Sequence, residues 1–105
     1  MESQEVIMIS YYAYKVKGGK LIKVKVELKD GLIQAITLLG DFFLHPEFVL
    51  EEIEASLKGV HLSEATIINE MGKVMERNQA ILIGASVEDF AQAIMSAWMA
   101  SNRKS

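Results

Sequence analysis

Residues 20–40, KLIKVKVELKDGLIQAITLLG, contain two strand-like segments on either side of a short turn. In residues 20–29 apolar and charged side chains alternate, which is typical of a strand with one buried face. The apolar positions are Ile22, Val24, Val26 and Leu28. Asp30-Gly31 then predicts a two-residue hairpin turn, because both residue types tolerate positive φ angles. We therefore expect residues 32–39 to return as the antiparallel neighbour.

The length of this turn sets how the two strands pair. A plain two-residue loop predicts three facing pairs: Leu28 with Ile33, Val26 with Ala35, and Val24 with Thr37. In that register Ile36 and Leu38 fall on the same face as the lysines of residues 20–29. They then form an apolar patch on a surface that is otherwise expected to meet water.

A second hairpin precedes the first, because residues 8–17, MISYYAYKVK, lead into Gly18-Gly19. A two-residue loop there turns Lys15 toward the core, where an unpaired charge costs several kcal/mol. We therefore favour a three-residue loop with a glycine bulge. In that arrangement Tyr12, Tyr14 and Val16 face inward, and Lys15 and Lys17 face outward. The three strands form an antiparallel meander.

After Gly40 the apolar period changes from two residues to about 3.6, which predicts helices. The first is expected to start at Pro46 and to end near Lys58. The second is expected to start at Ser63, and the third at Ser86 with Asp89 completing its cap. Residues 80–84, AILIG, are expected to be extended. The pattern predicts one α+β domain over residues 1–105, with its core at about 10–100: a three-stranded or slightly larger antiparallel meander with about three helices packed on one face.

Composition excludes several classes of protein. The 105 residues are 50% hydrophobic and 24% charged, with a net charge of −3 and no cysteine, so disulfides, thiolate catalysis and Cys-zinc sites are excluded. No signal peptide is indicated, and no run approaches the roughly 18 apolar residues of a membrane span, so we expect a cytoplasmic protein. His45 and His61 lack partners at metal-ligand spacing, so we expect neither a metal site nor a catalytic site in this chain alone.

Charge is distributed unevenly along the chain. Residues 15–29 hold six lysines and one acid, a net +5, whereas residues 41–54 hold five acids and no Lys or Arg. One interpretation is a solvated sheet face beside an acidic helix. The other is a basic face that meets a phosphate-bearing or acidic partner, with Ile36 and Leu38 as its apolar patch.

The segment Gly40-Asp41-Phe42-Phe43 joins the strand pattern to the helical pattern. Glycine permits a chain reversal there, and Asp41 is expected to cap it or to form an Asx turn. Neighbouring residues of an extended chain point in opposite directions, so one phenylalanine is expected to lie inward. Either both rings have structural roles, or the exposed one takes part in an interface.

The stretch YKVKGGKLIKVKVELKDGLIQAITLLGDFFLHPE, residues 14–47, with the acidic helix after it, resembles the C-terminal accessory domain of lipoate-protein ligases. The resemblance covers about residues 12–100. The matching pieces are Lys15, Gly18-Gly19-Lys20, Asp30-Gly31, Gly40-Asp41-Phe42-Phe43 and Pro46. Lys17 departs from the pattern, because many relatives have proline before the two glycines.

The resemblance implies an accessory subunit of a two-chain ligase, not catalytic alone. Such a ligase condenses lipoate with ATP, in the presence of Mg²⁺, to lipoyl-AMP, and then transfers the lipoyl group to a lysine of an acceptor domain. The implied partners are a catalytic chain, which holds the lipoate and adenylate pocket, and indirectly the lipoyl acceptor domains. Lys20, helped by Lys15 or Lys17, is the candidate for the phosphate side. The interface candidates are Asp41, Phe42, Phe43, Ile36 and Leu38.

Two other classes of function remain open. One is a module that binds single-stranded nucleic acid on the lysine-rich sheet with Tyr12 and Tyr14, although the net charge of −3 argues against nucleic acid. The other is a self-associating or ligand-binding domain that uses Ile36 and Leu38 as its pairing face. No membrane partner is expected under either alternative.

Overall fold

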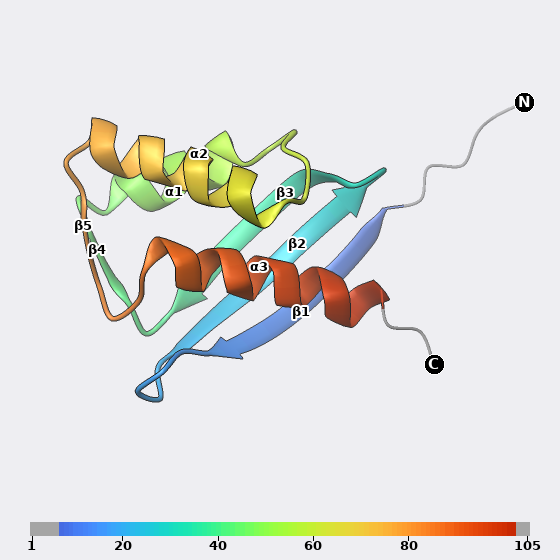
Figure 1. Cartoon of the computed structure of the whole chain (residues 1–105), viewed down its shortest axis with the longest axis horizontal. Helices are drawn as coiled ribbons and strands as arrows, with labels where there is room; N and C mark the ends of the chain where they lie inside the picture. The colour runs from blue at the N-terminus through green and yellow to red at the C-terminus, as the bar shows by residue number, and fades with distance from the viewer. Residues whose placement is uncertain (1–6, 103–105) are drawn as a thin grey trace, which may run out of the picture.

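A computed structural model describes residues 7–102 of the chain. Its main sheet is antiparallel, in the order β1 (Met8–Lys15), β2 (Leu21–Lys29), β3 (Leu32–Gly40). A second, antiparallel ribbon pairs β4 (Phe43–His45) with β5 (Ile81–Ile83). The helices are α1 (Phe48–Ser56), α2 (Glu64–Arg77) and α3 (Val87–Asn102), and they gather on one side of the main sheet (Figure 1). The predicted α+β meander with helices on one face is confirmed.

The core lies between that face of the sheet and the helices. Helix α3 packs on β1 and β2, α1 packs on β3, and α2 contacts both of the other helices. The buried hydroxyl of Ser10 on β1 donates to the carbonyl oxygen of Ala97 on α3 at 2.7 Å, which fixes the helix against the edge strand. Large side chains with almost no exposure fill the layer: Ile22, Val26, Ile33, Leu38, Val49, Ile53, Leu57, Ile67, Met71, Val74, Phe90 and Ile94.

The turn between β1 and β2 is the predicted three-residue loop. Val16 donates its amide to the carbonyl oxygen of Lys20 at 2.7 Å, and Gly19 donates to the carbonyl oxygen of Val16 at 3.0 Å. Val16 is buried, whereas Lys15 and Lys17 are exposed. The loop therefore keeps both lysines in water, as expected from the cost of burying a charge.

The pairing of β2 with β3 differs from the prediction beyond the turn. Leu28 faces Ile33 as expected, but a bulge follows, so that Glu27 faces Ala35 and the strands are offset by one residue from there on. Val26 then faces Ile36 and Val24 faces Leu38. The prediction that Ile36 and Leu38 lie on the lysine face is wrong. A shift of one residue exchanges the two faces of a strand, and burial of both side chains in the core favours the bulged register.

The caps of α2 and α3 match the prediction, and the start of α1 differs slightly. Ser63 accepts a hydrogen bond from the Thr66 amide at 3.4 Å. Ser86 and Asp89 exchange side-chain to backbone hydrogen bonds of 3.1 and 2.9 Å, a reciprocal cap. Helix α1 begins at Phe48, two residues after the expected start. The extended segment expected at residues 80–84 forms β5.

In the described part of the chain, each helix is too short or too polar to cross a lipid bilayer.

Candidate functional site

Three connections that are distant in sequence meet at one end of the molecule, away from the start of β1 and the end of α3 (Figure 1). They are the β1–β2 turn, the β3–β4 corner and the loop between β5 and α3. A Cβ atom placed on Gly84 would lie 3.4 Å from the Lys20 side chain and 3.1 Å from the carbonyl oxygen of Asp41. The glycine therefore leaves room for the other two connections. We call Gly18–Lys20, Gly40–Phe43 and Gly84 the corner site.

The backbone of the corner is held by a reciprocal pair of hydrogen bonds. Asp41 donates its amide to the carbonyl oxygen of Leu21 at 2.9 Å, and its carboxylate accepts from the Leu21 amide at 3.3 Å. The preceding Gly40 has a φ angle of +154°, and a Cβ there would collide with the carbonyl oxygen of Leu21. The carboxylate of Asp41 thus bonds to the start of β2, 20 residues earlier in the chain, which differs from the local cap or Asx turn that was expected. Glycine is required before it.

The two phenylalanines of the corner point in different directions. The ring of Phe42 packs edge-on against Phe90 of α3, with centroids 4.8 Å apart and planes at 81°. Phe43 is 55% exposed and faces Ile83 across the β4–β5 ribbon. The prediction of one inward ring and one exposed ring is confirmed. The inward ring anchors the corner to α3, and the outward ring is available at the surface.

The exposed face of the β4–β5 ribbon is largely apolar. Phe43, Ile81 and Ile83 are all more than half exposed, and His45 lies on the same face opposite Ile81. A hollow of about 330 Å³ adjoins this ribbon, and Glu47 is the acidic residue among those that line it. Its lining residues are Leu38, Leu39, Gly40, Phe42, Phe43, Leu44, Glu47 and Leu50. Apolar area of this kind on a surface is typical of a contact with another molecule.

The lysines predicted for the phosphate side surround the same end of the sheet. Lys17 and Lys20 lie in the β1–β2 loop region, Lys15 ends β1, and all three are exposed. Lys20 runs beside Gly84 and is the one whose side chain lies within the corner site. Three cations within six residues create a local positive potential, which favours phosphate or carboxylate groups.

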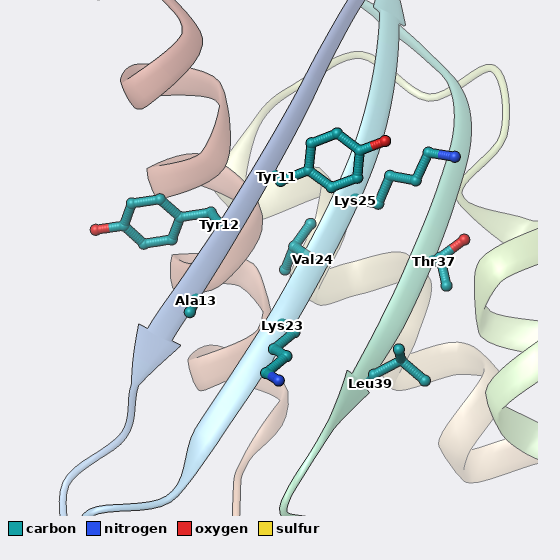
Figure 2. Close-up of a pocket in the computed structure, with 8 residues that line it drawn as sticks. All are labelled: Tyr11, Tyr12, Ala13, Lys23, Val24, Lys25, Thr37 and Leu39. Carbon is teal, nitrogen blue, oxygen red and sulfur yellow. The ribbon is translucent and has the colours of Figure 1, made fainter.

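The open face of the main sheet carries residues that the sequence interpretation missed. Figure 2 shows Tyr11 reaching across β2 toward Lys25, whereas the neighbouring Tyr12 points away from them. Lys25 Nζ lies 5.8 Å from the centre of the Tyr11 ring, and Leu39 on β3 is 59% exposed. Tyr11 could have been predicted on the open face, because neighbouring side chains of a strand point to opposite faces and Tyr12 was expected to face inward. Leu39 was missed because the bulge was not anticipated.

Residues 7–102 contain no group of three His, Asp or Glu side chains arranged to hold a metal ion.

Residues 12–94 match the family model described as the bacterial lipoate protein ligase C-terminus. The chain belongs to this family. The match includes the β1–β2 turn, the Gly40–Phe43 corner, Gly84 and the first half of α3. The resemblance noted from the sequence is thereby confirmed.

Two relatives extend the family assignment. Lipoate-protein ligase A subunit 2 of Thermoplasma acidophilum is 33% identical over 81 residues, which is 77% of this chain and 82% of that protein. A solved structure from an archaeal lipoylation system, described as a bi-partite lipoate protein ligase and its E2 lipoyl domain from the same organism, has a TM-score of 0.73 and 29% identity. That alignment covers 85% of this chain and 97% of the other chain. Within this family, the chain is thus similar to a protein that is named as a separate subunit of a ligase.

Proposed function

We propose that this chain is the accessory subunit of a two-chain lipoate-protein ligase. It acts with a catalytic chain in the ATP-dependent activation of lipoate to lipoyl-AMP, before the lipoyl group passes to a lysine of a lipoyl domain. The observation that carries the proposal is the alignment over most of both chains with a relative named as the second subunit of such a ligase. The similarity to a solved bi-partite ligase supports it.

In the activation step, the lipoate carboxylate attacks the α-phosphorus of ATP, the acyl phosphate bond forms, and pyrophosphate leaves. Negative charge increases on the phosphate oxygens as the bond to the leaving group breaks. Cations held at fixed positions stabilise that charge, most strongly where water is excluded. The proposed role of this chain is to cover the catalytic chain's pocket and to present positive charge to the phosphate side.

Lys20 is the proposed phosphate-side residue, with Lys15 and Lys17 as helpers. Its backbone is held in the β1–β2 loop by the hydrogen bond from Val16, and its side chain runs beside Gly84. A short loop with defined hydrogen bonds places a cation more precisely than a flexible tail does. Lys15 and Lys17 add to the potential from exposed positions at the end of β1 and in the turn that follows it.

Phe43 is the proposed contact with the catalytic chain. Its exposed ring lies on β4 across from Ile83, and Phe42 and Asp41 hold the corner from which it projects. An exposed aromatic ring beside an apolar neighbour such as Ile83 is the kind of residue that dominates the affinity of interfaces. This assignment makes Phe42 and Asp41 positioning residues.

Mg²⁺ and lipoate belong, in this proposal, to the pocket of the catalytic chain. Residues 7–102 offer no cluster of ligands that fits Mg²⁺, so no step is assigned to a metal held by this chain. The contribution of this chain is limited to contact, charge and exclusion of water.

The deciding experiment measures lipoyl-AMP formation from lipoate and Mg-ATP by the catalytic ligase chain of the same organism, with and without this protein. A parallel assay supplies lipoyl-AMP and follows transfer to a lipoyl domain. We expect adenylation to require both chains and transfer from supplied lipoyl-AMP to proceed with the catalytic chain alone. If this protein changes neither reaction and does not co-elute with that chain, the proposal is wrong.

The role of Lys20 is tested in the assembled complex with Lys20→Ala, and Lys58→Ala on the helical side serves as the control. We expect a loss of adenylation of about tenfold or more for the first variant only, because one charged contact in a transition state contributes on that order. Unchanged adenylation rate and ATP affinity for Lys20→Ala would remove Lys20 from the site without affecting the subunit assignment.

A further inference from the structure

The open face of the main sheet carries no helix in the described part of the chain, since all three helices lie on the other side (Figure 1). Its side chains form aligned rows across the strands. One row is Tyr11, Lys25 and Thr37, and the next is Ala13, Lys23 and Leu39. Apolar side chains therefore alternate with lysines across one continuous surface. We call these six residues, with Ile9 and Lys15 at the two ends of β1, the open face.

This surface is hollowed and apolar at its centre. A shallow depression of about 430 Å³ lies between the strands' outward side chains (Figure 2). Ile9, Tyr11 and Leu39 are each more than half exposed. Monomeric proteins rarely leave such area uncovered on a regular sheet, where it is also an aggregation hazard. The combination indicates a surface that another molecule covers.

The open face is continuous with the corner site. Leu39 lines both the depression on the sheet and the hollow beside Phe43. A single partner that contacts Phe43 can therefore extend over Leu39 to Lys23 on β2 and Ala13 on β1. The two exposed apolar regions become parts of one interface.

The charges on this face define the partner. Lys15, Lys23 and Lys25 are cationic, and Glu27, which lies 4.0 Å from Lys25, is the acid in the adjacent row. Lys15, Lys23 and Lys25 lie toward the corner end of the sheet, whereas Glu27 and then Lys29 lie farther from it along β2. The surface therefore fits a partner that is apolar at its centre and acidic where it meets the lysines.

We propose that the open face of the sheet, together with Phe43, is the surface that docks on an acidic and apolar patch of the catalytic ligase chain. The inference rests on the proposed function for the identity of the partner. It goes further by assigning the face: the catalytic chain packs on the uncovered side of the sheet, opposite the helices. The helical side, with its acidic α1, remains in solvent.

Two other occupants fit the observations less well. Face-to-face packing of two copies would bring together two surfaces on which the lysines outnumber Glu27, and this repulsion between like net charges opposes a symmetric dimer. Single-stranded nucleic acid binds to platforms with several stacked aromatic rings. Here Tyr11 is exposed, whereas Tyr12 and Tyr14 pack against the core.

The experiment measures the affinity of the full-length variants for the catalytic chain by titration calorimetry, and their folding by thermal melts. Leu39→Asp tests the apolar centre, and Met99→Asp on α3 is the matched control, since the two side chains are 59% and 57% exposed. The double variant Lys23→Glu/Lys25→Glu tests the charges, with Lys58→Glu as its control. Adenylation by the wild-type pair is measured alongside.

We expect Leu39→Asp and the double lysine variant to weaken binding by about tenfold or more, while both controls bind as the wild type does. The effect of the lysine variant should shrink as salt concentration rises, because screening weakens attraction between exposed charges. If the wild type binds and supports adenylation, but Leu39→Asp and the lysine variant do so equally well, the assigned face is wrong and the subunit function stands.

Other outcomes also overturn the inference. If the wild type neither binds the catalytic chain nor supports adenylation, the proposed function fails and this inference fails with it. Self-association in light scattering that Leu39→Asp abolishes would assign the face to a second copy. Tight binding of a labelled oligonucleotide that the lysine variant abolishes would assign it to nucleic acid.

Discussion

The carboxylate of Glu54 on α1 accepts a hydrogen bond from the backbone amide of Leu38 on β3 at 2.9 Å. Leu38 belongs to an outer strand of the main sheet, whose outward amides would otherwise pair with water or with another chain. A side chain of α1 thus satisfies a backbone amide on the outer edge of β3. Nearby, the loop of residues 59–62 pairs with the beginning of the same strand. The β3 edge is therefore occupied within the chain at Leu38 and at residues 31–33, whereas no helix covers the open face of the sheet.

Glu54→Ala should lower the free energy of unfolding by about 1–3 kcal/mol, because the Leu38 amide loses its charged acceptor. Glu54→Gln keeps an acceptor oxygen and should cost less. Glu51→Ala, an exposed position on the same helix, is the control. Urea denaturation measures all three. Equal stability of Glu54→Ala and Glu51→Ala would show that this hydrogen bond contributes nothing.

Gly40→Ala should destabilise the fold by more than about 2 kcal/mol, because its Cβ meets the Leu21 carbonyl and its φ angle is positive. Gly72→Ala is the opposite case. Gly72 lies inside α2 with no atom within 4 Å of an added Cβ, so alanine should stabilise by roughly 0.5–1 kcal/mol. Thermal melts of the two variants test the sign of each effect. A stable Gly40→Ala protein would contradict the close approach of the two strands.

Phe42→Ala and Phe43→Ala should separate stability from binding. Removing the half-buried ring of Phe42, which packs on Phe90, should cost about 2–4 kcal/mol of unfolding free energy. Removing the exposed ring of Phe43 should cost less than about 1 kcal/mol. Affinity for the catalytic ligase chain should fall for Phe43→Ala despite its stability. Wild-type affinity in that variant would exclude Phe43 from the interface.

Acid should weaken the contact between α1 and α2. The carboxylate of Glu52 accepts hydrogen bonds from Arg77 at 2.7 Å and from Asn78 at 2.8 Å. These bonds lower the pKa of Glu52 below its ordinary value of 4.5, and the bond from Arg77 has the larger effect. The pKa is lower in the folded state than in the unfolded state, so the folded state favours the ionised form. The stabilisation is therefore present above about pH 4.5 and is lost as the pH falls through the folded-state pKa.

This dependence is measured by comparing wild type and Glu52→Gln in urea denaturation between about pH 7 and about pH 3. The wild type should be the more stable protein near neutrality, and the difference should shrink toward acid pH. Glu51→Gln, whose side chain is exposed on the same helix, controls for the general effect of removing a carboxylate. A difference that stays constant with pH would contradict the prediction.

Local patterns predicted most of the elements because their causes are local. The alternation in residues 20–29, the Asp30-Gly31 turn and the serine caps at Ser63 and Ser86 each depend on neighbours a few residues away. The split between Phe42 and Phe43 also follows from the geometry of an extended chain. The three-residue loop after Val16 was predictable because a buried lysine is costly.

The register of β3 was not predictable in this way. A bulge adds one residue to one strand, and its occurrence depends on which side chains the whole core can bury. Here Ile36 and Leu38 gain burial against the helices, and Leu39 is placed in solvent. The bulge therefore places Leu39 on the lysine face, beside Tyr11 of β1, in place of the expected Ile36 and Leu38.

By itself the sequence determined the three strands of the main sheet, the three helices, the hairpin turns, the serine caps and the family, because these follow from short-range chemistry and a contiguous motif. It did not indicate β4, which forms by pairing with β5. The tertiary structure decided the register beyond the bulge, the meeting of Lys20 with Gly84, and which face of the sheet stays uncovered. Each of these depends on contacts between residues far apart in the chain. Such contacts are selected by the packing of the complete core, and no local pattern contains that information.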